Sequence, residues 1–230
     1  MNELLLSAAF VQINTIKGYR CLDDAGKIMN RWDEEFPAKR VGADGLDMSN
    51  DGDVLRAIKV TVDRIWLHFV SPQHANSVVK HASVVLAEMC GVMEIQECRR
   101  IGMRLQYVRA APNLSDAVKG LANALLGSEW QEQIEHLSDG RSFTLALGLV
   151  DADLHIGFKA STALLNPKLA PTPTETLPRQ VVLLDFDLYT EERTSITQLP
   201  KFLKRAEKWI SQHLPEYTAL AYKEAQKNGS

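Results

Sequence analysis

Two arginines and a glycine recur at every second position in one segment of the chain, as Arg100, Gly102 and Arg104, and Gln106 continues the spacing. Residues two apart in a β-strand point to the same face of the sheet, so all four would lie together. A glycine adds no side chain between the two guanidinium groups, which could then bind a carboxylate or phosphate in bidentate fashion. The alternative interpretation is a solvated face, or ion pairs with neighbouring carboxylates.

Carboxylates alternate in the same way in two later segments. If these segments are neighbouring strands, their oxygen and imidazole ligands could meet around a divalent cation. Two alternatives stay open, because the earlier pair of aspartates also suits a hairpin turn and the later pair could bond to the arginines across the sheet. The candidate metal ligands are Asp151, Asp153, His155, Asp185 and Asp187.

A tryptophan lies on the polar side of another alternating segment. Trp66 stands between Ile65 and Leu67, so we expect it to face away from the core. An exposed tryptophan on a sheet could stack on a nucleic-acid base. It could also pack under a loop or lie in a dimer interface, where tryptophan is enriched, and we favour the interface.

The composition limits the class of protein. The chain has 230 residues, 45% of them hydrophobic and 24% charged, which is typical of a globular protein. A net charge of −3 without a dense Lys/Arg run does not favour nucleic acid as the partner. Three cysteines without a CxxC motif and no apolar stretch of ~20 residues predict a cytoplasmic protein rather than a secreted or membrane one. No P-loop, G-x-S-x-G, G-x-G-x-x-G or H-E-x-x-H motif occurs, so we assign no catalytic residue and expect no cofactor.

Hydrophobic periodicity predicts the order of elements in the first half of the chain. We expect strand, helix, strand, strand, helix, strand, which is the order of a ferredoxin-like unit. The predicted elements are a strand over 4–16, a helix capped by Asp23 and ending near Pro37, a loop over 38–53, a hairpin over 58–69, a helix from Ser71–Pro72 to Gly91, and a strand over 98–109.

The second half reads as an incomplete copy of the first. We expect a helix over 115–126, a hairpin turning at Asp151, a proline-rich loop over 166–179, a strand over 181–189, and an amphipathic helix with Pro200 in its first turn that Pro215 ends or kinks. The predicted fold is therefore α+β, with a mixed, mainly antiparallel sheet covered by helices on one face. Two ferredoxin-like halves, 1–110 and 111–230, are a hypothesis within that class.

The Arg100-Ile101-Gly102-Met103-Arg104 strand, followed by an Asp-Phe-Asp-Leu-Tyr strand and a long terminal helix, resembles a family of sporadically distributed bacterial proteins of unknown function. In that family the strand continues with a tyrosine, an apolar residue and an asparagine, where this chain has Leu105, Gln106 and Tyr107. The resemblance implies a bacterial, cytoplasmic protein and, by association, a genome-defence setting. It implies no activity.

These observations favour an interaction or regulatory module that binds a protein partner or itself through an open sheet face or an edge strand. We lean against an enzyme. The first alternative is an RNA-binding or RNA-processing protein, because CRISPR repeat-RNA endonucleases also have tandem ferredoxin-like halves. Those enzymes carry a basic cleft and often a C-terminal glycine-rich loop, whereas this chain is slightly acidic and is predicted to end in a helix. The last alternative is a metal-dependent hydrolase that uses the aspartate clusters.

Overall fold

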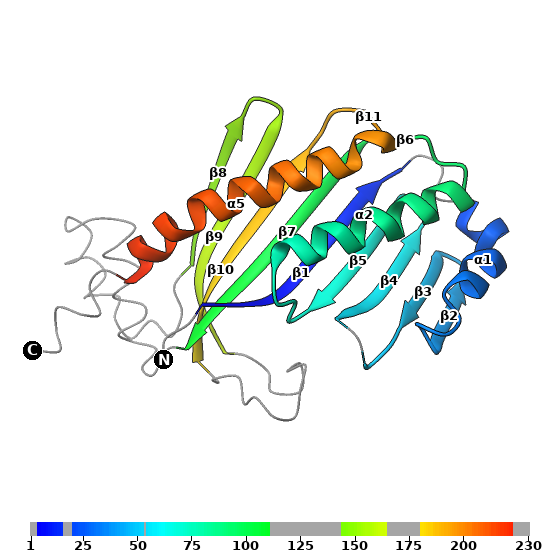
Figure 1. Cartoon of the computed structure of the whole chain (residues 1–230), viewed down its shortest axis with the longest axis horizontal. Coiled ribbons are helices and arrows are strands. Elements are labelled where there is room, and N and C mark those ends of the chain that lie inside the picture. The colour runs from blue at the N-terminus through cyan, green and yellow to red at the C-terminus, as the bar shows by residue number, and fades with distance from the viewer. Residues whose placement is uncertain (1–3, 16–19, 53, 111–143, 165–179, 223–230) are drawn as a thin grey trace, which may run out of the picture.

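One large sheet dominates the fold. The computed structural model describes residues 4–15, 20–52, 54–110, 144–164 and 180–222, and within them nine strands pair in the order β2-β3-β4-β5-β1-β7-β10-β9-β8 (Figure 1). Every pairing in this sheet is antiparallel. The strands are β1 (Leu5–Asn14), β2 (Ala38–Gly42), β3 (Gly45–Ser49), β4 (Leu55–Thr61), β5 (Arg64–Val70), β7 (Arg100–Ala110), β8 (Thr144–Asp151), β9 (Leu154–Leu164) and β10 (Gln180–Thr190).

Side-chain alternation along the strands separates a buried face from a polar one. In β1, Ala9, Val11 and Ile13 are fully buried, whereas Phe10 and Gln12 between them are half-buried. The same alternation runs along β5. Period-two patterning of this kind is typical of an antiparallel sheet with one face on the core.

The described helices cover the buried face. The described part of the chain has α1 (Arg20–Arg31), α2 (Ala75–Val92) and α5 (Leu199–Tyr222). Figure 1 shows α2 and α5 side by side across the sheet, where α2 packs on β5 and β1 and α5 packs on β7 and β10. The short strands β6 (Glu97–Cys98) and β11 (Thr194–Ser195) pair with each other, and the 3₁₀ helix η3 (Ile196–Gln198) leads into α5. The predicted α+β class, with a mainly antiparallel sheet and helices on one face, is confirmed.

The predicted loop over 38–53 is wrong, because this segment contains the hairpin β2–β3. The loop was predicted because glycine and aspartate are frequent in this segment. The short alternation of β3, in which Leu46 and Met48 are buried and Asp47 is exposed, is the strand signal. Gly45 adopts a φ of 152°, and a Cβ at this position would lie 1.9 Å from the Val60 carbonyl oxygen. Only glycine allows β3 to approach β4 this closely.

The boundaries of three predicted helices also need correction. The helix α1 begins at Arg20, with Asp23 inside its first turn, and ends at Arg31 rather than near Pro37. The helix α2 starts at Ala75 and includes Gly91. The helix α5 continues through Pro215 to Tyr222, because a proline removes one intrahelical hydrogen bond and a helix can absorb that loss. The predicted helix over 115–126 and the proline-rich loop over 166–179 lie outside the described residues.

Both predicted halves contribute to the same sheet. The strand β10 pairs with β7 from Val181–Ala110 to Thr190–Ile101, which joins the second half to the first. The described strands β8, β9 and β10 are successive neighbours, whereas β1 lies between β5 and β7. These strand orders differ among the described strands, and two ferredoxin-like halves stay a hypothesis. None of the described helices is long and apolar enough to span a membrane.

Candidate functional site

The sheet surface opposite α2 and α5 bears no described helix, and we call it the open face. Strand pairing aligns one row of residues across all nine strands of the sheet: Arg40, Asp47, Lys59, Trp66, Gln12, Gly102, Tyr189, His155 and Val150. A parallel row contains His68, Phe10, Arg104 and Asp187. The predicted placement of Arg100, Gly102, Arg104 and Gln106 on one strand face agrees with this register.

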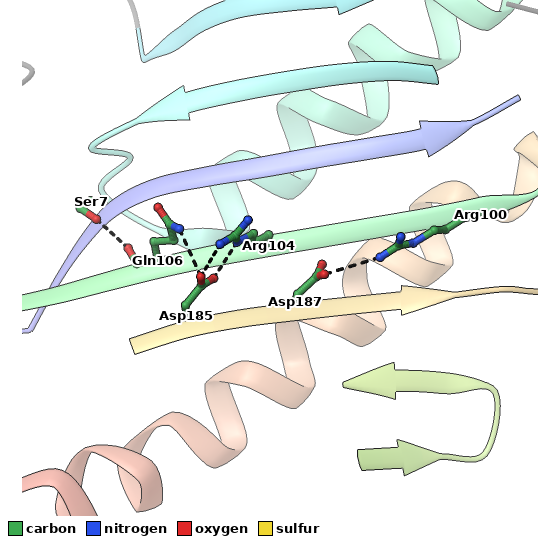
Figure 2. Close-up of polar contacts among 6 residues, drawn as sticks. All are labelled: Ser7, Arg100, Arg104, Gln106, Asp185 and Asp187. Atoms are coloured by element: carbon green, nitrogen blue, oxygen red, sulfur yellow. Dashed lines mark hydrogen bonds and ion pairs between the residues drawn. The ribbon is translucent and has the colours of Figure 1, made fainter. Parts of the chain in front are cut away.

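Arg104 is held by a carboxylate of the neighbouring strand (Figure 2). Its Nε and Nη2 atoms donate to the two oxygens of Asp185 at 2.8 and 2.5 Å, and Gln106 Nε2 donates to the same carboxylate at 3.3 Å. The Asp185 side chain is only 6% exposed, so these donors replace the water that its charge has lost. The hydrogen bonds that Arg104 donates to Asp185 raise the pKa of its guanidinium.

Arg100 is engaged more loosely. Its Nη2 lies 3.5 Å from an Asp187 oxygen, and its guanidinium carbon lies 3.9 Å from the centre of the Tyr189 ring. The His155 ring stacks on Tyr189 with a centroid separation of 5.1 Å. Burial raises the pKa of the Asp187 carboxyl, and the charges of Arg100 and Arg104 partly oppose that rise. Both arginines therefore adopt the ion pairs that the sequence left open as an alternative.

The glycine between the two arginines does not form an empty notch. Gly102 is buried opposite Tyr189. A Cβ at this position would meet the Tyr189 Cβ at 3.6 Å, which is an ordinary contact. Both flanking guanidinium groups already bond to carboxylates, so an external anion would compete with Asp185 and Asp187 for their charge.

The candidate metal ligands are dispersed. Asp153 lies beyond the end of β8 and accepts a hydrogen bond from Arg205 of α5 at 2.5 Å, while His155 stacks on Tyr189. Asp185 and Asp187 bond to the arginines of β7 instead. Among the described residues, no three His, Cys, Asp or Glu side chains lie close enough together to hold a metal ion.

Three aromatic rings form a cluster on β1 and β5, which we call the ring cluster. Phe10 stacks on His68 at a centroid separation of 4.6 Å and an interplanar angle of 5°, and on Trp66 at 5.4 Å and 26°. All three side chains are half-buried on the open face. Burial, with the charge of Arg56 as a second cause, lowers the pKa of His68, so its ring is neutral at neutral pH. The expectation that Trp66 faces away from the core is thus met.

An open hollow of about 540 Å³ adjoins the ring cluster. Trp66 lines it, so this ring contacts Phe10 and also borders a space large enough for a small ligand. Within the lining, Asp63 accepts hydrogen bonds from Thr61 and Arg64. The hollow is lined by Gln12, Asp44, Lys59, Thr61, Val62, Asp63, Arg64 and Trp66.

Sequence reasoning missed Phe10 and most of the hollow, whereas His68 was expected to face away from the core together with Trp66. A signal for Phe10 was present, because it alternates with the buried Ala9 and Val11 and so had to face the same side as Trp66. No signal existed for Asp44, since the segment around it was predicted as a loop. Its position follows from the β2–β3 hairpin and from the pairing of β3 with β4.

Comparisons of the chain with protein-family models, with curated proteins and with solved structures give no match. The resemblance to a bacterial family of unknown function therefore stays a prediction. The geometry of the open face is therefore the basis of the functional proposal.

Proposed function

We propose that this protein is a binding module for single-stranded nucleic acid and that its binding surface is the open face around the ring cluster. The single observation that carries the proposal is the stacked set of Phe10, Trp66 and His68 on two adjacent central strands. The sequence by itself favoured a protein partner, whereas this geometry favours nucleic acid as the partner.

The ring cluster lies outside the hydrophobic core. The core on the other face is complete without these rings, which remain partly accessible to solvent. Aromatic side chains on an open sheet are the usual platform for unpaired bases, since every base has a face that can stack. Two cations near the rings, Lys59 and Arg64, each form an exposed ion pair with an aspartate and keep N–H donors that can contact the sugar–phosphate backbone of a bound strand.

The charge distribution favours a single strand over a duplex. The chain carries a net charge of −3, and Arg100 and Arg104 are paired with carboxylates. A duplex hides its base faces and must be held mainly through phosphates, which requires a basic surface. A surface of aromatic rings gains affinity from base stacking, and its binding should depend less on salt than binding that is held mainly through phosphates.

A direct titration tests the proposal. Fluorescence anisotropy of a labelled 12-nucleotide RNA of mixed sequence is measured at low salt, beside its duplex and the DNA strand of the same sequence. We expect the single strand to bind and the duplex to bind more weakly. Replacing Phe10 by Leu should weaken binding by about 5- to 150-fold, the range expected when one stacking ring is lost. The proposal is contradicted if the wild-type chain binds the duplex as tightly as the single strand. It is also contradicted if the Phe10→Leu variant binds the single strand as tightly as the wild type does.

A protein–protein role is the second candidate, and the edge strand β8 is the observation that favours it. Leu147, Leu149 and Val150 of β8 are 42%, 46% and 65% exposed, and no charged residue precedes Asp151 in this strand. The opposite edge strand β2 is shorter and carries Lys39 and Arg40. Charged, short edges resist further strand pairing, whereas a long apolar edge invites it.

The partner that fits β8 is a second copy of the chain. Two β8 strands can pair antiparallel about a two-fold axis, because each presents the same apolar sequence to the other. Sedimentation equilibrium should then show a dimer that Leu149→Lys converts to monomer, while Val41→Lys on β2 leaves it unchanged. A monomeric wild-type chain removes this candidate.

A further inference from the structure

We propose that the hollow beside Trp66 is a guanine-binding pocket, in which the carboxylate of Asp44 recognises the base. This inference rests on the proposed function, because the base belongs to the bound single strand. It goes further by naming the residue that distinguishes one base from the other three.

The lining residues come from four separate parts of the sheet. Trp66 belongs to β5 and pairs with Lys59 of β4, while Gln12 of β1 lies on the other side of Trp66. Asp44 lies in the turn between β2 and β3, next to Gly45, which pairs with Thr61 of β4. Trp66 and Asp44 thus approach the hollow from strands about 10 Å apart, so a base stacked on the indole can present its edge to the carboxylate.

Most polar groups around the hollow are already engaged. Asp63 accepts hydrogen bonds from Thr61 Oγ1 at 2.6 Å and from Arg64 Nη2 at 3.0 Å. Lys59 forms an ion pair with Asp47 at 3.6 Å. Gln12 donates its Nε2 to Asn14 Oδ1 at 2.6 Å.

Two acceptors of the lining remain without a partner among the described residues. Across the part of the chain that the structure describes, the Asp44 carboxylate has no hydrogen bond or ion pair, and the Gln12 amide oxygen has none either. The two cations of the lining are each paired with an aspartate. A ligand group that supplies N–H donors can therefore bond to the Asp44 carboxylate, while Lys59 and Arg64 keep N–H donors for acceptors of the same ligand.

Guanine is the base that matches a free carboxylate best. Its Watson–Crick edge has two adjacent donors, N1–H and the N2 amino group, which can bond to both oxygens of one carboxylate. Adenine and cytosine place a ring nitrogen acceptor beside their amino group, and uracil places a carbonyl on each side of its single N–H. In those three bases one carboxylate oxygen would face an acceptor, which is unfavourable.

The test compares four labelled 12-nucleotide RNAs that contain only uridine except for one central G, A, C or U. We expect the wild-type chain to bind the G-containing strand about tenfold more tightly than the others, as for one bidentate base contact. Asp44→Asn should remove this preference for the G-containing strand. Asp47→Asn is the matched control, because Asp47 is an exposed carboxylate outside the lining, and it should keep the preference.

Equal affinity for the four strands, or an Asp44→Asn variant that keeps the preference, overturns the guanine pocket while the proposed function stands. Chemical-shift titrations with GMP and UMP test the guanine pocket independently of the single-strand function. If no RNA strand binds but GMP shifts the Asp44 and Trp66 amides and UMP does not, the pocket is correct and the single-strand function is wrong. If neither an RNA strand nor GMP binds, both proposals fail.

Discussion

The open face has two halves that use similar residues in different ways. In the half formed by β7 and β10, which we call the ion-pair half, Arg104 and Arg100 bond to Asp185 and Asp187. In the half formed by β1 and β5, the ring cluster half, Phe10 and its neighbours stack on each other and border the hollow. The ion-pair half contains the conspicuous sequence motif, yet its charges are satisfied within the chain. The ring cluster half has no recognisable motif and contains the surface for which we propose binding.

This difference shows why a charged motif is a poor guide to a binding site. A guanidinium group that holds a carboxylate which is 6% exposed cannot leave it without exposing or stranding a charge. An indole at the border of a hollow loses only water when a ligand arrives, and the loss is favourable. The two halves differ in how far folding has already engaged their side chains, rather than in residue type.

The largest expected effect is on affinity for RNA. Trp66→Leu in the ring cluster half should weaken binding of the mixed 12-nucleotide RNA by about 5- to 150-fold, because one stacking ring is lost. Tyr189→Leu in the ion-pair half lies in the same row of the sheet and should change the affinity less than about twofold. Anisotropy titrations of both variants at the same salt check this contrast. A reversed order of the two effects would place the binding site in the ion-pair half.

The next effect is on stability and distinguishes the two arginines. Arg104→Met leaves Asp185 buried without its main partner, and we expect the free energy of unfolding to fall by about 2–3 kcal/mol. Arg100→Met breaks a 3.5 Å contact between partly exposed groups, so the expected loss is less than about 1 kcal/mol. Urea denaturation measures both. Equal losses would show that burial of Asp185 does not control the energetics of this half.

Acid should weaken the ring cluster half. Burial lowers the pKa of His68 from its ordinary value of 6.5, so the unfolded chain binds the proton more tightly than the folded chain does. Stability from this group is present above pH 6.5 and is lost as the pH falls below it. The His68→Phe variant keeps a ring on Phe10 and cannot titrate. The wild type should therefore lose stability relative to this variant between pH 7 and 5, by less than the Arg104→Met change. A constant difference across this range contradicts the prediction.

The smallest effect has the opposite sign and lies in the ion-pair half. Burial raises the pKa of Asp187 above 3.8, so stability from this carboxyl is greatest below pH 3.8 and is lost as the pH rises through the folded-state pKa. Asp187→Asn removes the cost of the buried charge and should stabilise the chain at pH 7 by less than about 1 kcal/mol, since the side chain is 43% exposed. Thermal unfolding at pH 7 and pH 3.5 should show the gain at the higher pH only. Destabilisation at pH 7 would mean that the Arg100 contact outweighs desolvation.

Sequence patterns predicted the long strands and the helices with a clear apolar stripe. The strands β1, β7 and β10 and the helix α2 were found because their alternation or 3.6-residue periodicity extends over many residues. The hairpin β2–β3 was missed because five-residue strands rich in glycine and aspartate resemble a loop. Its strand character comes from pairing with β4, which is a contact with a distant segment.

The candidate site was predicted only in part, for the same reason. The shared face of Arg100, Gly102, Arg104 and Gln106 follows from spacing within one strand. The partners of that face follow from which strands are neighbours, and local periodicity does not specify that. Phe10 and His68 are stacked because β1 and β5 pair in one register, and a shift of either strand by one residue would move its ring to the core face.

The sequence by itself determined which side chains of each strand face solvent and which build the core, because a period of two or 3.6 is a local property of the backbone. Only the tertiary structure decided that Asp185 pairs with Arg104, that Trp66 meets Phe10, and that Asp44 reaches the hollow. These contacts join segments that are far apart in the chain. They are fixed by strand order and register, which arise when the whole sheet packs against its helices.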